Sequence, residues 1–248
     1  MTTVNLMRSE FRKLTTTRMP LAFLAVLTVL AVTNGIAVAI GTDMDGSKTF
    51  ISTAADQQSL VAFAANSLMI AGLFGAVAAA REYGHNTVIA TYLSAPHRSR
   101  AVSAQLTAIG FGGAILGLVG ASLTTAGVAA ALPFTDFGFM ITAGGVAHVL
   151  AASAFSGAAG AVLGAGIGSV IRNTGGAVTG TVVILVIAPP LIVQLASGAA
   201  PWIPNTLALV ASGVAEGTSV AGSVMGIALW ALVPALIALV TVQRRDVV

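Results

Sequence analysis

The sequence predicts an all-α, polytopic membrane protein with six transmembrane helices, because the chain is too apolar to form a soluble globule. Its 248 residues have a mean hydropathy of +0.96, and only 8% of them are charged. A hydrocarbon core needs about 20 apolar residues for each crossing helix, so a chain of this length holds six crossings and little else. We therefore expect a single transmembrane domain over residues 1–248.

Six uncharged apolar stretches lie between the charged residues, and we expect one helix in each. The stretches on either side of Asp136 are long, but two crossings and a turn need about 40 residues, so each holds one long or broken span. Pro189 and Pro190 predict a broken helix in the fifth stretch, followed by short outer helices over 201–216. The six stretches cover residues 19–41, 60–80, 101–135, 137–171, 175–212 and 217–243.

The basic residues predict which way the chain faces. With the N-terminus inside, ten of the eleven Lys and Arg residues fall on inner segments, and only Lys48 falls outside. The opposite orientation would violate the bias of basic residues towards the cytoplasm. We therefore expect a multi-pass protein of the bacterial inner (plasma) membrane with both termini in the cytoplasm.

Composition excludes several classes of function. The chain has no cysteine, so it has neither disulfides nor a thiolate metal site. His85 and His97 are 12 residues apart with no carboxylate between them, which is poor geometry for a metal site. No run of basic residues indicates nucleic-acid binding. Residues 41–49 mimic a phosphate loop, but Ser47 separates the glycine from the lysine, so we expect no cofactor on this chain.

Ionisable side chains are nearly absent from the expected spans. His148 is the exception, and it is either a member of a proton relay or, as we favour, a hydrogen-bonded packing residue. Ion-driven transporters bury carboxylates or paired charges along their pathway, and an intramembrane enzyme needs convergent acid, base or metal groups. We therefore expect neither an enzyme nor an ion-driven transporter.

Residues 1–18 form a basic leader with helical periodicity. Apolar residues that include Met7 and Phe11 recur on one face, while Arg8 and Arg12 lie together on another. The pattern predicts a short N-terminal amphipathic helix. Two roles stay open for it: an elbow helix that contacts membrane lipids along the cytoplasmic leaflet, or a basic flank that only sets topology.

The inner loop over 81–100 is the most polar segment between two expected spans. It combines charged residues with two histidines and two tyrosines, and β-branched and aromatic residues between 87 and 93 could pack into a protein groove. Pro96 would end a short helix in this loop. The loop therefore predicts a docking surface for a cytoplasmic partner, with a solvated basic loop as the simpler alternative.

Taken in order, these features resemble the type-2 ABC exporter permeases, which are six-span membrane subunits that work with a separate ATPase chain. The likeness spans nearly the whole chain. Gly84 and Asn86 depart from the family's pattern, since a basic residue and a glycine usually stand there, and Gln105 stands where a lysine is common. The landmarks are residues 7–13 of the leader, then Glu82, Tyr83, Thr87, Pro96 and Arg98, then residues 168–174 and 244–247.

The resemblance implies a permease domain that works as a homodimer with two cytoplasmic ABC ATPase subunits, which would hold the ATP and Mg²⁺. The leader would be an elbow helix, the loop over 81–100 a coupling helix, and the substrate an exported amphipathic or hydrophobic molecule. The alternative is a membrane recruitment or sensor subunit that binds a cytoplasmic partner without transport. The residues assigned in this way are Met7, Arg8, Phe11 and Arg12 in the elbow, and Glu82, Tyr83, Thr87 and Tyr92 in contact with the ATPase.

Overall fold

The computed structural model describes residues 3–43, 46–84 and 98–244, and the regular structure in these segments is helical throughout. Six of its helical segments are long and apolar enough to cross a membrane, so the expectation of an all-α, multi-pass membrane protein is confirmed. The six spans are Met19–Ile40, Ala54–Gly84, Ser99–Phe134, Ala143–Ile171, Thr174–Leu195 and Val220–Arg244.

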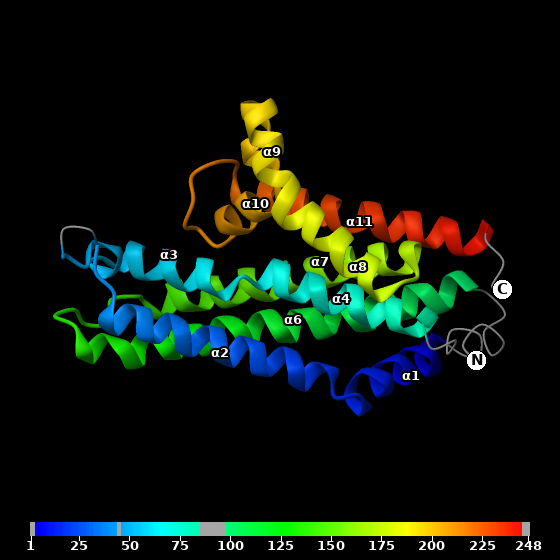
Figure 1. The fold of residues 1–248 in the computed structure, drawn as a ribbon, viewed down its shortest axis with the longest axis horizontal. Coiled ribbons are helices and arrows are strands. Elements are labelled where there is room, and N and C mark those ends of the chain that lie inside the picture. Colours follow the sequence, from blue (N-terminus) through cyan, green and yellow to red (C-terminus); the bar gives the residue numbers. More distant parts are fainter. Residues whose placement is uncertain (1–2, 44–45, 85–97, 245–248) are drawn as a thin grey trace.

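The helices form an elongated bundle (Figure 1). Helix α1 and the last turns of α11 lie at one end, which we call the terminal end, while the turn before α3 lies at the opposite, distal end. The elements are α1 (Thr3–Thr16), α2 (Met19–Ile40), η1 (Thr49–Ile51), α3 (Ala54–Ala65), α4 (Ser67–Gly84), α6 (Arg98–Ala131), η2 (Leu132–Phe134), α7 (Ala143–Ile171), α8 (Thr174–Val182), η3 (Val183–Ile187), α9 (Ala188–Leu195), η4 (Ser197–Trp202), α10 (Pro204–Ala211) and α11 (Val220–Arg244).

Glycine-rich faces bring α7 into close contact with both α4 and α6. A Cβ atom added to Gly164 of α7 would overlap the carbonyl oxygen of Gly72 on α4, and one added to Gly113 of α6 would overlap that of Gly157 on α7. Small residues allow helix backbones in a membrane to approach this closely. We call these contacts the glycine seam, and it joins α4, α7 and α6 into the most closely packed part of the bundle.

The second span begins earlier than its apolar stretch and contains a break. Helix α3 begins at Ala54, before the predicted start at residue 60, because Thr53 and Asp56 form a reciprocal capping box that places an acidic residue inside the helix. Asn66 then adopts a left-handed conformation with φ of 38°, and α4 begins at Ser67. Asn tolerates this conformation better than most residues. We call this interruption the α3–α4 break.

The fifth span stays helical through Pro189 and Pro190, so the predicted break at these prolines was wrong. Its first helix, α8, widens into the π-helical turn η3 before α9 begins. A proline clashes with the carbonyl group four residues earlier and cannot donate to it. That carbonyl group belongs to Leu185, in the π-helical turn, and it accepts a hydrogen bond from Asn205 Nδ2 at 3.0 Å instead.

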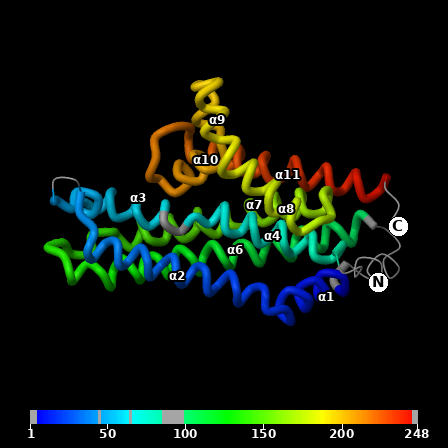
Figure 2. Tube along the Cα trace, viewed as in Figure 1, coloured from blue at the N-terminus to red at the C-terminus, as the bar shows by residue number. Residues whose placement is uncertain are grey.

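After α9 the chain returns through two short helices, η4 and α10. The short helices predicted over 201–216 are found over 197–211, and the residues from 212 to 219 form a turn. Trp230 of α11 donates from Nε1 to the carbonyl oxygen of Trp202 at 2.9 Å, which ties η4 to α11. Helix α9 points away from the long axis of the bundle (Figures 1 and 2).

A buried glutamine holds the loops of the distal end together. Gln57 is fully buried and donates from Nε2 to the carbonyl oxygens of Ile51 and Gly138, at 3.1 and 2.9 Å. Its Oε1 accepts from the backbone N–H of Met140 at 2.9 Å. A buried amide with these bonds stabilises both loops, since leaving any of the three backbone groups unpaired would cost free energy.

Candidate functional site

Within the described residues, two sites gather several polar side chains that could serve a function, one at the terminal end and one at the α3–α4 break. The first is a set of five side chains that we call the terminal cluster: Glu10, Lys13, Glu82, Tyr83 and Arg172. Lys13 Nζ lies 2.6 Å from Glu10 Oε1 and 3.2 Å from Glu82 Oε1. The cluster therefore joins the leader helix α1 to the last turn of α4.

Burial sets the charge state of this cluster. Glu10 has a side chain that is only 5% exposed, and burial raises its pKa, with a further increase from the charge of Glu82 nearby. Burial alone would lower the pKa of Lys13, but the charges of Glu82 and Glu10 outweigh it, so the pKa of this amine is raised. Lys13 therefore carries a positive charge between two carboxyl groups.

The other half of the cluster joins α4 to the turn between α7 and α8. The Arg172 guanidinium lies over the ring of Tyr83, with 5.1 Å between Cζ and the ring centroid, as in a cation–π contact. Arg172 ends α7 in a left-handed conformation with φ of 58°. Its Nε and Nη2 atoms are buried without a hydrogen-bond partner. The last turn of α4 thus contacts both α1 and the α7–α8 turn.

The residues expected to contact an ATPase fall into two groups. Glu82 and Tyr83 end α4 and belong to the terminal cluster, whereas Thr87 and Tyr92 lie outside the described residues. Glu82 is engaged within its own chain by Lys13, so its structural role is to hold the start of the inner loop. Its contact with a partner stays a prediction.

The leader residues divide between a packed face and an exposed face. Met7 and Phe11 are partly buried, whereas Arg8 and Arg12 are exposed. The Phe11 ring packs edge-on against Phe111 of α6, with the centroids 5.4 Å apart. The amphipathic helix expected in the leader is therefore present as α1. Its packed face rests on α6, and its exposed arginines suit lipid headgroups.

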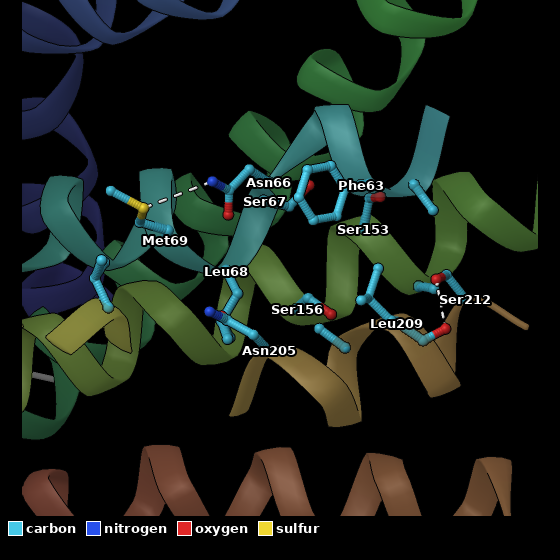
Figure 3. Close-up of a pocket in the computed structure, with 14 residues that line it drawn as sticks. Phe63, Asn66, Ser67, Leu68, Met69, Ser153, Ser156, Asn205, Leu209 and Ser212 are labelled. Atoms are coloured by element: carbon cyan, nitrogen blue, oxygen red, sulfur yellow. Dashed lines mark hydrogen bonds between the residues drawn. The ribbon is translucent and has the colours of Figure 1, made fainter. Parts of the chain in front are cut away.

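The second site is a pocket of about 240 Å³ at the α3–α4 break, which we call the break pocket. Its fourteen lining residues come from α3, the break itself, α4, α7, η3, α10 and the residue after α10 (Figure 3). Apolar side chains such as Phe63, Leu68 and Leu209 make up much of its wall. The pocket exists because the break interrupts the close packing of this span against α7.

Three serine hydroxyls line the break pocket without a hydrogen-bond partner in the described part of the chain. Ser67 is 7% exposed, and its Oγ atom is buried without a hydrogen bond. Ser153 and Ser156 of α7 are 6% and 3% exposed, and neither side chain makes a hydrogen bond to the described part of the chain. Buried hydroxyl groups normally find a partner. The sequence offered one signal for this site: a consecutive Asn and Ser in the middle of an apolar stretch.

His148 differs from its expected role as a packing residue. Its side chain is exposed on α7, and a Cβ atom on Gly213 would lie 3.4 Å from its Nε2. Over residues 3–43, 46–84 and 98–244, no group of three His, Cys, Asp or Glu side chains could hold a metal ion. Among the residues that the structure describes, we take the terminal cluster and the break pocket as the two candidate sites.

In comparisons with known proteins, no family model and no relative of established function matches this chain. The resemblance to permeases thus stays a prediction from residues and topology. Functional assignment rests on the two sites described above and on the six spans that connect them.

Proposed function

We propose that the chain is the membrane-spanning permease subunit of an ATP-driven ABC exporter in a bacterial inner membrane. Its terminal end would face the cytoplasm and bind separate ATPase subunits, and a second copy would complete a homodimer. The substrate would be an amphipathic or hydrophobic molecule that leaves the cell. The observation that carries this proposal is the ion pair from Lys13 in the leader to Glu82 at the start of the inner loop.

This ion pair supports a mechanical role for the inner loop. Lys13 ties α1 to the last turn of α4, and Arg172 over Tyr83 ties the same turn to the end of α7. A partner that moves the loop would therefore move α1, α4 and the α7–α8 turn together. Such a partner shifts the conformation of the permease only if it binds one arrangement more tightly than another.

Helix α4 connects the loop to the break pocket. It runs from Ser67 at the pocket to Gly84 at the start of the inner loop. At 1.5 Å per residue this helix is about 27 Å long. Because the glycine seam packs α4 tightly against α7, a displacement of its terminal end would be carried along its length to the pocket rather than absorbed by soft side chains.

The proposal is tested by purifying the tagged, full-length chain from its native membrane in mild detergent. We expect a stoichiometric ATPase to be recovered with the parent chain, and ATP turnover to drive substrate flux in proteoliposomes. Tyr92→Ala should reduce ATPase recovery through lost contact, and Glu82→Gln should reduce it by releasing the start of the loop. Glu216→Gln makes the same change of charge on an exposed residue before α11 and should leave recovery unchanged.

Two results would contradict the proposal in different ways. Recovery of the chain alone, in every detergent tried, would remove the ATP-driven mechanism. A bound ATPase that turns over without any flux would instead favour a recruitment or sensor subunit. The terminal cluster would serve that second function equally well, because holding a loop in place for a partner does not require transport.

A further inference from the structure

The break pocket places unpartnered polar groups in an otherwise apolar bundle. Ser67 is at least nine-tenths buried and its Oγ atom lacks a hydrogen bond, and Ser156 of α7 is still more buried. A buried hydroxyl without a partner costs free energy that a bound molecule could recover. The hydroxyl groups at this position can therefore form hydrogen bonds with a bound molecule.

The first turn of α4 also lies at the pocket. A helix leaves its first N–H groups without acceptors in its own helix, and α4 starts at Ser67, inside the second span rather than at its end. In apolar surroundings such groups must be satisfied by side chains, water or a ligand. Together with the serine hydroxyls, they favour a ligand whose polar group accepts hydrogen bonds.

The same pocket argues against a charged ligand. None of its fourteen lining residues is Asp, Glu, Lys, Arg or His. A charge in a site with no counter-ion pays a large desolvation cost that dipoles alone do not recover. The ligand's polar group is therefore an uncharged one, such as a glycerol, amide or ester.

The size and walls of the pocket indicate the remainder of the ligand. A pocket of about 240 Å³ lies below the usual range for sites that enclose a whole small molecule. Phe63 is 72% exposed where it lines the pocket, and Leu68 and Leu209 supply further apolar wall. A polar head would fill the pocket, and an alkyl tail would leave it past Phe63 into the surrounding hydrocarbon.

We propose that the break pocket binds the uncharged, hydrogen-bond-accepting head of an amphipathic molecule, which the serines of α4 and α7 recognise. Naming this molecule as the exported cargo rests on the proposed function, whereas binding itself does not. Asn205 of α10 also lines the pocket and bonds to the carbonyl oxygen of Leu185 in η3. The occupant would thus touch the second, fourth and fifth spans at once.

Cysteine protection tests this proposal directly, because the chain contains no cysteine. Ala152→Cys places one thiol in the pocket wall without removing any polar group. Its rate of reaction with a small methanethiosulfonate reagent would be measured on the purified chain in lipid nanodiscs. Three probes each carry a chain of twelve carbons and differ in the charge of their heads: 1-monolauroylglycerol is neutral, laurate is an anion and dodecyltrimethylammonium is a cation. Gly198→Cys, at an open and exposed position of η4, is the matched control.

We expect 1-monolauroylglycerol to slow labelling of the Ala152→Cys variant at concentrations where the two charged probes do not, and to leave the Gly198→Cys variant unaffected. Adding Ser67→Ala or Ser156→Ala should weaken protection about tenfold each, the effect of one lost hydrogen bond. An unchanged labelling rate without any probe would confirm that the pocket is intact in these variants.

Three results would overturn the proposal: no protection by the neutral probe, equal protection by all three heads, or full protection in the serine variants. The assay contains no ATPase, so its outcome is independent of the purification described above. If the neutral probe binds selectively but the chain recruits no ATPase, the pocket is still a ligand site. The proposal that its ligand is exported would then be wrong.

Discussion

Helix α7 has two neighbours that it meets in opposite ways. Towards α4 it presents glycines. In the span Ala54–Gly84, 56% of the residues in the apolar 18-residue stretch are buried. Towards the fifth span it presents larger side chains. In the span Thr174–Leu195, only 22% of the residues in the apolar 18-residue stretch are buried. Ile167 of α7, for example, would lie 3.2 Å from a Cβ atom on Gly180 of α8.

The difference separates a closely packed part of the bundle from a more open part. Where two backbones touch, as at Gly164 and Gly72, no volume remains for a ligand or for sliding. Where the second span is interrupted at Asn66, its close packing against α7 stops and the break pocket forms. Close packing and open space therefore both lie along the contact of the second span with α7, the first along α4 and the second at the α3–α4 break.

The largest expected effect comes from breaking the glycine seam. Gly164→Leu places a branched side chain against the backbone of Gly72, and we expect a loss of about 3 kcal/mol in the free energy of unfolding. The measurement is thermal unfolding in detergent, followed by size-exclusion chromatography. Gly198→Leu adds the same side chain at a position with no atom within 4 Å and should leave stability unchanged. If the two substitutions had equal effects, close packing at the glycine seam would not be the cause of the lost stability.

The terminal cluster should give a smaller effect, because charges rather than touching backbones hold it. Lys13→Met and Glu82→Gln should each destabilise the fold by about 2 kcal/mol, between the values for exposed and buried ion pairs. In a double-mutant cycle the two losses should be non-additive, since each substitution removes the same contact. Simple addition would mean that the two side chains act independently.

The contact between α10 and the fifth span should respond less in stability than the terminal cluster. Asn205→Leu leaves the carbonyl oxygen of Leu185 unpaired, and we expect a cost of about 1 kcal/mol, as for other single hydrogen bonds within membranes. Protection of the Ala152→Cys variant by 1-monolauroylglycerol should fall at the same time, because Asn205 also lines the pocket. A large loss of stability without any change in protection would place the most closely packed part of the bundle at this contact instead.

The smallest effect is a dependence on pH. The pKa of Glu10 is raised above its ordinary value of 4.5, so the folded state binds this proton more tightly than the unfolded state does. Its contribution to stability is present in full below pH 4.5 and is lost as the pH rises through the raised pKa. Thermal unfolding of the parent chain and of Glu10→Gln, compared across this range, should differ by that contribution. Parallel curves would contradict the raised pKa.

Hydropathy and residue spacing along the chain predicted the transmembrane spans and the leader helix of this fold. Six apolar stretches and an amphipathic leader follow from composition and spacing alone, and α1 and the six spans are present. The start of α3 was missed because Asp56, read as a charge outside the span, caps the helix from inside it. A capping box is itself a local pattern, so this error was avoidable.

Contacts between distant residues could not be predicted in the same way. The pairing of Gly164 with Gly72 depends on the three-dimensional arrangement of α7 and α4, which hydropathy does not give. The bond from Asn205 to Leu185 replaces the one that Pro189 cannot make, so it needs both the short helix α10 and the π-helical turn. For the same reason the pairing of Lys13 with Glu82, 69 residues apart, was not foreseen.

The π-helical turn η3 also sets the rotation of α9 about the helix axis. A π-helical turn is equivalent to one residue inserted into an α-helix, and one residue corresponds to about 100° of rotation and 1.5 Å of rise. Deleting a single residue from Val183–Ile187 would let the span close up as an α-helix. Helix α9 would then turn by about 100° and present a different face to its surroundings. The number of residues in the π-helical turn therefore sets the orientation of α9. A chain shortened by one residue here would still be apolar and helical, but α9 would face a different direction.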